Sequence, residues 1–182
     1  MDLLGLSMGG FIAQVIAAEE PQLVRKVILA GTGPAGGPGI DKITALTIRA
    51  MLKGFLTRKE PKQFLFFTDT DHGRKQARAS LERLKERTDD HDKAISLPSF
   101  RTQLRAIHRW GLHPPADLSR IGQPVLVVNG ESPRMAPSEN TLDLAARLTR
   151  GELVLLSLDA GHGGILQYHD EFVAQALGFL EP

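Results

Sequence analysis

The 182-residue sequence contains no cysteine, which excludes disulfide bonds, thiolate metal ligands and a cysteine nucleophile. It also has no apolar run near the roughly 18 residues needed to span a bilayer. The net charge is only +1, so nothing favours nucleic acid or a membrane surface as a partner. Hydrophobic residues make up 42% and charged residues 24%, which is typical of a globular chain with its own core.

The first 18 residues are apolar and end in small residues, as in a secretory signal peptide. However, the only early charge is Asp2, where such peptides carry Lys or Arg, and Gly9 and Gly10 would break the apolar helix. We therefore predict a cytoplasmic protein.

Short apolar segments bounded by turn residues alternate with segments of helical spacing. The predicted strands are residues 2–6, 26–30, 125–128 and 153–158. The predicted helices outside the middle of the chain are 11–18, 138–150 and 171–180. Pro21 and Gly151 are placed to end the first two of these helices. The alternation predicts an α/β fold, with a parallel sheet and flanking helices.

The middle of the chain has a different pattern. Residues 41–117 show no strand pattern and carry 16 Lys and Arg against 10 Asp and Glu. Helices are predicted there at 43–56, 74–87 and 99–110. We interpret this stretch as a helical insertion between two strands. The predicted division is a core part at 1–34, a helical cap at 35–118 and the remainder of the core at 119–182.

The motif Gly5-Leu6-Ser7-Met8-Gly9, with Gly10 after it, follows the first predicted strand and precedes a helix. The pattern G-x-S-x-G is typical of a serine held on a sharp strand-to-helix turn, where its hydroxyl is exposed for nucleophilic attack. The glycines would allow a strained turn and close strand–helix packing. The backbone N–H of Met8 would point at a developing oxyanion. The alternative is an ordinary glycine-rich turn with an incidental serine.

A histidine follows the last predicted strand, in Ala160-Gly161-His162-Gly163-Gly164. A histidine on a flexible loop at the end of a strand can reach across the edge of the sheet. The order Ser7 before His162 is the one found in α/β-hydrolases. We interpret the other histidines as surface, cap or structural residues: His72, His91, His108, His113 and His169.

These motifs together resemble the C-terminal part of an α/β-hydrolase of the serine esterase, lactonase and cofactor-free haloperoxidase type. The resemblance covers nearly the whole chain and implies the α/β-hydrolase fold, with Ser7 as nucleophile, His162 as base and Met8 as oxyanion donor. It implies no cofactor and no metal.

The chain departs from this family at the acid. The family has an aspartate in a loop of the form Gly-x-x-Asp-x-Met-Val-Pro, and here the matching position is Pro133, which has no carboxylate. Glu131 and Asp159 are candidate replacements, of which Glu131 is preferred because it shares the loop. The alternative is that both are solvated loop carboxylates. Loss of this acid lowers turnover by ~10⁴-fold in serine proteases.

The second departure is at the start of the chain. The family places about four strands before the nucleophile, and here residues 2–6 are the only predicted strand before Ser7. Their absence would leave residues 2–6 as an exposed edge strand, which favours self-association. It would also remove the second oxyanion donor, which is worth ~10²–10³ in rate.

The resemblance implies a serine hydrolase that acts on a small-molecule ester or lactone. The alternatives are a truncated, catalytically impaired homologue and a cofactor-free haloperoxidase or perhydrolase. Residues 64–67, Met51, Phe55 and Trp110 are candidates for an apolar acyl pocket, or for the core of the cap itself. The basic charge of the insertion would attract anionic substrates, or it belongs to solvated helix faces.

Overall fold

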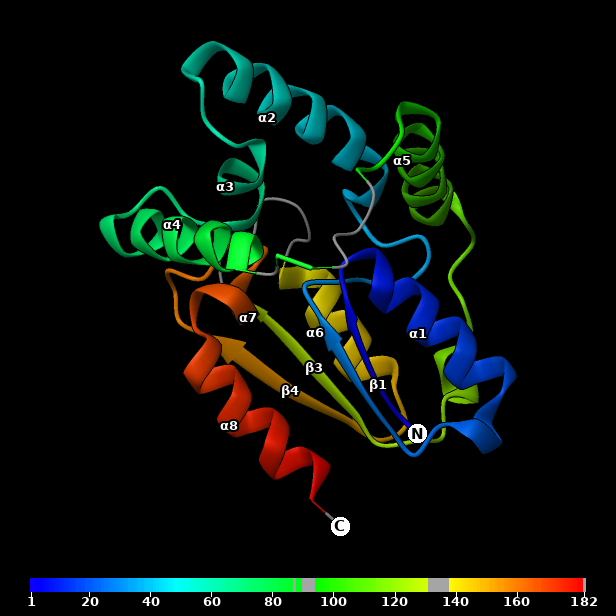
Figure 1. The fold of residues 1–182 in the computed structure, drawn as a ribbon. Helices are drawn as coiled ribbons and strands as arrows, with labels where there is room; N and C mark the ends of the chain where they lie inside the picture. The colour runs from blue at the N-terminus through cyan, green and yellow to red at the C-terminus, as the bar shows by residue number, and fades with distance from the viewer. Residues whose placement is uncertain (87, 90–93, 131–137, 182) are drawn as a thin grey trace.

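The computed structural model describes residues 1–86, 88–89, 94–130 and 138–181. In this part of the chain the strands form one parallel sheet in the order β1-β2-β3-β4 (Figure 1). The strands are β1 (Asp2–Leu6), β2 (Lys26–Ala30), β3 (Val125–Gly130) and β4 (Gly151–Leu156). Each strand pairs with its predecessor in sequence, so all the carboxyl ends meet at one edge of the sheet.

Helices cover both faces of the sheet (Figure 1). They are α1 (Met8–Glu19) and α6 (Ser138–Arg147) on one face, and α8 (His169–Leu180) on the other, preceded by the short α7 (Gly164–Gln167). Because side chains alternate along a strand, Val27 and Leu29 of β2 pack with α1 and α6, whereas Ile28 packs with α8. The central strands are therefore buried on both faces, which explains their continuous apolar sequence.

The sequence-based prediction of a parallel α/β sheet is confirmed. Strands β1 and β2 have the predicted bounds, while β3 extends two residues further and β4 begins two residues earlier. Helix α1 begins at Met8, three residues before the predicted start, and ends before Pro21 as expected. The prediction that Gly151 ends α6 is wrong. Helix α6 ends at Arg147, and Gly151 is the first residue of β4.

The connection between β2 and β3 is helical in its described residues and lies over the carboxyl ends of the strands (Figure 1). We call its main helices and their connections the insertion: α2 (Ile43–Thr57), α3 (Pro61–Phe66), α4 (Asp71–Glu86) and α5 (Leu97–Leu112). Trp110 of α5 stacks on Phe11 of α1 with 4.9 Å between ring centroids, which joins the insertion to the core. The boundaries of the three proposed parts stay a prediction.

Short 3₁₀ turns complete the connections: Pro21–Leu23, Ile40–Lys42 and Leu118–Arg120. Strand β1 lies at one edge of the sheet as described here. Leu4 of β1 and Ile12 of α1 are half exposed, at 54% and 52%. Self-association through this edge stays a prediction. None of the described helices combines the length and the apolar character that crossing a membrane requires.

Candidate active site

Ser7 occupies a strained turn between β1 and α1. Its backbone has φ 54° and ψ −119°, and non-glycine residues rarely adopt such a positive φ. Hydrogen bonds hold this turn in place: the Ser7 N–H donates to the Ala30 carbonyl at 2.9 Å, and the Thr32 hydroxyl donates to the Ser7 carbonyl at 2.8 Å. The end of β2 therefore fixes the serine at the edge of the sheet.

Two of the three motif glycines have a steric role. A Cβ at Gly5 would collide with the backbone of Gly9, and a Cβ at Gly10 would lie within 2.6 Å of the Thr32 side chain. Gly9 has open space around it among the described residues, so the expectation of a steric need at that position is wrong. The positive φ of the turn belongs to Ser7 itself and to none of these glycines.

Met8 is the first residue of α1 and directly follows Ser7. The first N–H groups of a helix have no acceptor within the helix and carry the positive end of its dipole. The Met8 N–H therefore lies at the position where an oxyanion donor is expected for a nucleophile at Ser7.

His162 is brought to Ser7 by the loop between β4 and α7 (residues 157–163), which we call the His162 loop. The Nε2 atom of His162 lies 3.0 Å from Ser7 Oγ, although the two residues are 155 positions apart in the sequence. Such a distance permits proton transfer between a nucleophile and its base. The site joins two residues that the sequence analysis had selected separately.

The imidazole of His162 is almost completely enclosed, with 2% of the residue exposed. The Phe66 ring of α3 packs against it with 5.5 Å between centroids. Burial disfavours the charged form and lowers the pKa of His162 from its usual 6.5 to about 4. The ring is therefore neutral at pH 7 and has the protonation state that a base needs.

The other ring nitrogen, Nδ1, is buried and has no hydrogen-bond partner among the described residues. In the Ser-His-Asp arrangement a carboxylate binds the Nδ1 proton, which leaves Nε2 free to accept the serine proton. If no residue binds that proton, the tautomer with its proton on Nε2 becomes competitive, and this tautomer donates to Ser7 instead of accepting from it.

The predicted acid position, Pro133, and the preferred replacement, Glu131, both lie outside the described residues. Asp159 is described and binds elsewhere. Its Oδ2 atom accepts from the Thr70 hydroxyl at 2.8 Å and from Gln167 Nε2 at 3.4 Å, and we find no hydrogen bond to His162 within the described residues. The position of Asp159 therefore does not supply the missing partner of Nδ1.

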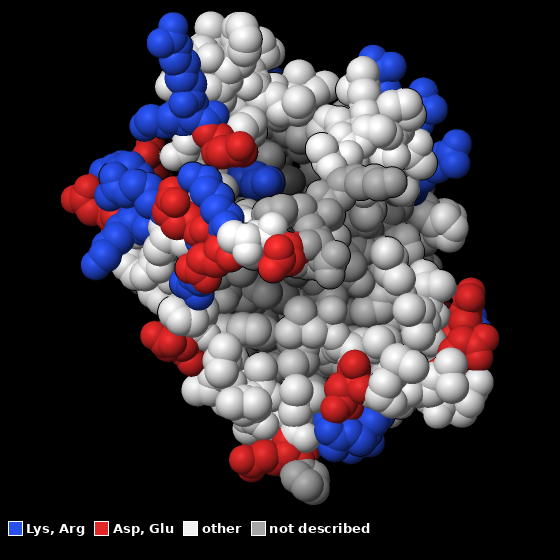
Figure 2. Space-filling view, in the orientation of Figure 1, with Lys and Arg blue, Asp and Glu red and all other residues white. Residues whose placement is uncertain are grey.

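A cavity of about 460 Å³ lies between the insertion and the His162 loop, and His162 forms part of its wall. Of the candidates for an acyl pocket, Phe64, Leu65 and Phe67 line it and Phe66 and Trp110 do not, and Ser7 is not among its lining residues. Met51 and Phe55 are exposed instead, at 44% and 82%. Four cationic side chains and two acidic ones also line it: Arg49, Lys53, Lys59, Arg74, Asp69 and Asp159. Figure 2 shows both charges crowded over the α4 side of the insertion, beside a hollow.

The remaining histidines lie away from Ser7 where they are described. The His72 ring packs at a tilt against Tyr168, His108 contacts the Asp41 carbonyl, and His169 pairs with its neighbour Asp170. His91 falls outside the described residues. No group of acidic or histidine side chains suited to a metal ion is found within the described ranges.

Sequence reasoning missed the contacts of three residues that shape the site: Gly31, Phe66 and Gln167. Phe66 was named there only as a candidate for the acyl pocket or for the core of the cap. Gly31 has φ 51° and lies directly against His162. Phe66 contacts the imidazole, and the buried Gln167 binds the His162 loop. A glycine after a strand was a signal for Gly31, but no local pattern marks the other two.

Comparisons with known proteins identify the fold family. The alpha/beta hydrolase fold family matches residues 1–167. An alpha/beta hydrolase fold protein from Chitinophaga pinensis is 38% identical with a TM-score of 0.90, and the match covers 99% of this chain and 64% of that chain. No curated protein matches the sequence.

More distant structures share the fold. The enol-lactonase from Burkholderia xenovorans is 20% identical with a TM-score of 0.69, over 97% of this chain and 64% of that chain. Est816, described as an N-acyl homoserine lactone degrading enzyme, is 21% identical with a TM-score of 0.67. The match covers 98% of this chain and 67% of that chain. The chain therefore spans about two thirds of the length of these structures. By the family match over residues 1–167, the chain belongs to the alpha/beta hydrolase fold family.

Proposed function

We propose that this chain carries the nucleophile and the base of a serine hydrolase that acts on a small ester or lactone. The observation that supports this most is the 3.0 Å distance between Ser7 Oγ and His162 Nε2, at a serine held in a strained turn. Family membership supports hydrolysis in general. The ester or lactone class rests on the Ser–His pair, because this pair performs acyl transfer.

In the first half of the proposed reaction, Ser7 Oγ attacks the substrate carbonyl carbon while its proton passes to His162 Nε2. The carbonyl π electrons move to oxygen, and the Met8 N–H stabilises that oxyanion. When the oxyanion collapses, the bond to the alkoxy group breaks and His162 returns the proton to the leaving oxygen. The products are an alcohol and an acyl group bound to Ser7. A lactone gives the same bond changes with its alcohol still attached.

In the second half, a water molecule attacks the acyl carbon and gives a proton to His162. Collapse of the second oxyanion breaks the bond to Ser7 Oγ, and His162 protonates that oxygen. A carboxylic acid leaves and Ser7 is restored. We propose that the insertion acts as a cap and that the cavity beside His162 holds part of the substrate, because its lining includes Phe64, Leu65 and Phe67.

A second candidate is a catalytically impaired homologue. The observation that favours it is the unpartnered Nδ1 atom of His162, together with proline at position 133, where the family resemblance expects the acid. Loss of that acid costs ~10⁴-fold in turnover in related chemistry. The two candidates share the same residues and differ in the rate at which Ser7 reacts.

A fluorophosphonate probe tests the proposal, because it forms a covalent bond with an activated serine. The chain should be labelled at Ser7, located by mass spectrometry of the labelled peptide. Ser7→Ala should abolish labelling and His162→Ala should slow it strongly. Ser119→Ala, a change at an exposed serine, is the matched control and should label as the native chain does.

Labelling no faster in the native chain than in Ser7→Ala would contradict the hydrolase proposal and support the impaired homologue. Equal labelling of the native chain and His162→Ala would show that His162 is not the base.

A further inference from the structure

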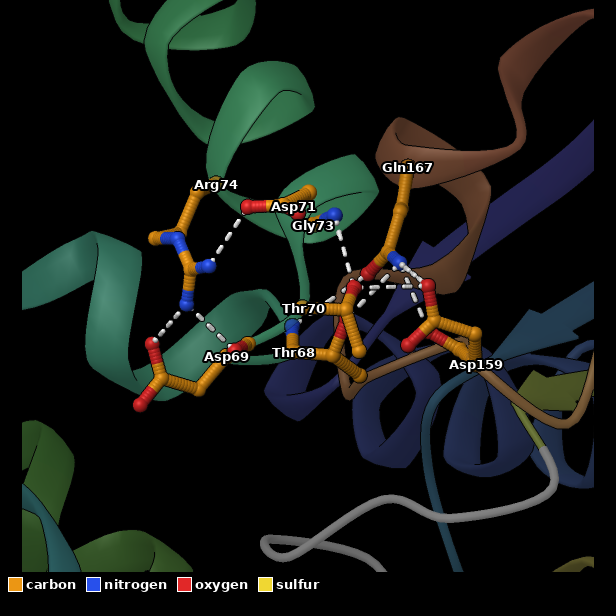
Figure 3. Close-up of polar contacts among 8 residues, drawn as sticks. All are labelled: Thr68, Asp69, Thr70, Asp71, Gly73, Arg74, Asp159 and Gln167. Carbon is orange, nitrogen blue, oxygen red and sulfur yellow. Dashed lines mark hydrogen bonds and ion pairs between the residues drawn. The ribbon is translucent and has the colours of Figure 1, made fainter.

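Gln167 ends α7 and is buried, with 1% of its surface exposed, so it cannot reach a substrate. Both the oxygen and the nitrogen of its carboxamide form hydrogen bonds. The oxygen accepts from the backbone N–H groups of Gly161 at 3.3 Å and Thr68 at 3.4 Å. The nitrogen donates to the Asp159 carbonyl at 2.6 Å and to the Thr68 hydroxyl at 3.0 Å (Figure 3). One side chain therefore joins the His162 loop to the insertion.

The same two segments make further contacts on both sides of His162. The Gly163 N–H donates to the Phe66 carbonyl at 2.7 Å, and the Thr70 hydroxyl donates to Asp159 Oδ2 at 2.8 Å. A Cβ added at Gly161 would lie 2.7 Å from the Phe66 carbonyl oxygen. The insertion is thus held against the backbone immediately before and immediately after His162.

These contacts matter because no described residue orients the imidazole in the usual way. A carboxylate on Nδ1 normally fixes the ring of such a base, and Nδ1 has no partner among the residues the structure describes. The ring is instead enclosed by Ser7, Phe66 and Gly31, none of which carries a charge. Its orientation therefore depends on where the loop and the insertion hold the backbone.

We propose that Gln167 is a positioning residue that couples the insertion to His162. By binding Asp159, Gly161 and Thr68 at once, it keeps the His162 loop where Nε2 stays within hydrogen-bond distance of Ser7 Oγ. Movement of the insertion away from the core breaks these bonds and displaces the base. This inference rests on the proposed function in one respect, namely that Ser7 and His162 form the reactive pair.

The competing explanation is that Gln167 only stabilises the fold. The chain offers a matched control in Gln123, which is also buried, at 8% exposure. Its amide donates to the backbone carbonyls of Ala17 at 3.1 Å and Pro21 at 3.2 Å, at the far end of α1. Replacement of either glutamine by leucine leaves buried backbone groups without a partner, so both variants should lose thermal stability to a similar degree.

The experiment compares Gln167→Leu, Gln123→Leu and the native chain. We expect Gln167→Leu to lower the rate of fluorophosphonate labelling at Ser7 by about 10- to 100-fold, because a displacement of 1 Å at a reacting group has an effect of that size. Gln123→Leu should stay within about two-fold of the native rate, because its partners lie outside the site.

A second measurement follows the His162 ring by NMR of ¹⁵N-histidine-labelled protein during a pH titration. In Gln167→Leu, water reaching the loosened ring should move its titration midpoint upward by at least about one unit, and in Gln123→Leu the midpoint should not move. Equal labelling rates and equal midpoints in the two leucine variants would overturn the inference. This measurement needs no reaction, so it decides the role of Gln167 even where the native chain fails to label.

If Gln167→Leu does not fold, Thr68→Val replaces it, because this change removes one acceptor of the Gln167 amide and leaves the Asp159 contact intact. Its labelling rate and ring titration should change in the same direction by smaller amounts. Native values for both in Thr68→Val would overturn the proposed coupling.

Discussion

The backbone of Gly31 runs so close to His162 that a Cβ at position 31 would lie 2.7 Å from the His162 carbonyl oxygen and 3.4 Å from Nδ1. The unpartnered side of the imidazole therefore faces main chain from the end of β2. There is no room at position 31 for a side chain that could serve Nδ1.

Gly31→Ala tests this contact. The substitution forces a Cβ into the space of the His162 carbonyl and places alanine at φ 51°. The free energy of unfolding, measured by urea denaturation, should fall by about 1–3 kcal/mol. A strained backbone and a steric overlap each cost an energy of that order. Gly122→Ala is the control, since nothing lies within 4 Å of a Cβ there. Equal losses in the two variants would refute the close contact.

The buried imidazole should make stability depend on pH. In the unfolded chain His162 takes up a proton near pH 6.5, whereas in the folded chain burial delays this until about pH 4. The unfolded state binds more protons between these values, so stability falls as pH falls through this window. The part of the free energy of unfolding lost through His162 is about 3 kcal/mol, because each unit of difference between the folded and unfolded pKa is worth about 1.36 kcal/mol.

Urea denaturation from pH 4 to 8 measures this dependence. His162→Gln should remove that part of the slope, and His113→Gln, a change at an exposed histidine, should not. An unchanged slope in His162→Gln would show that the imidazole is not buried in its neutral form.

An acid can be introduced by mutation at the position where the family resemblance expects one. The family resemblance aligns Pro133 with the acid, so Pro133→Asp should raise the rate of Ser7 labelling, with ~10⁴-fold as the upper limit. It should also raise the titration midpoint of His162, because a nearby carboxylate favours the imidazolium. Pro133→Ala controls for the loss of the proline ring, and Ser132→Asp for the added charge.

Similar labelling of Pro133→Asp and Ser132→Asp would contradict the alignment at position 133. If Glu131 replaces the acid in the native chain, Glu131→Gln should slow labelling strongly. An unchanged rate would exclude that role for Glu131.

The charge around the cavity should affect substrate choice. Four cations and two acids line it, so an ester with a terminal carboxylate should be preferred over a neutral ester of equal length. The pair p-nitrophenyl hemisuccinate and p-nitrophenyl butyrate measures this as a ratio of kcat/KM. The double change Arg49→Glu with Lys53→Glu should lower that ratio by about 10-fold. Each reversal replaces an attraction between the substrate carboxylate and an exposed cation, worth about 0.2–1 kcal/mol, by a repulsion.

Arg101→Glu with Arg105→Glu reverses the same charge on α5, among residues that do not line the cavity, and should leave the ratio nearly unchanged. Equal changes in the two double variants would attribute the preference to net charge. An unchanged ratio in the Arg49 and Lys53 variant would place the substrate elsewhere.

Local sequence patterns predicted much of the fold. The bounds of strands β1 and β2 were predicted correctly, because each strand is a short apolar segment that is followed by a glycine-rich segment. Helix α3 was missed because its six residues are too few to show a helical period. Strand β4 was placed two residues late, because its first residues are held by pairing with Val125 and Leu126 and not by their own hydrophobicity.

The site shows the same division. Ser7 and His162 each stand in a glycine-rich motif, so the sequence identified them as candidates. Gln167 carries no such mark, since its importance comes from partners at Thr68 and Asp159 that only the folded chain brings together. The two candidate residues were therefore visible in the sequence, while the contacts of Gln167 were not.

The order of the strands also determines when the site can form. Strands β2, β3 and β4 each pair with the strand before them in sequence, so this part of the sheet can be extended in the order of synthesis. The contact between Ser7 and His162 spans 155 residues and requires the last strand. The strained serine turn can thus form before the proposed base arrives, and reactivity at Ser7 should appear only once β4 and the His162 loop have joined the sheet.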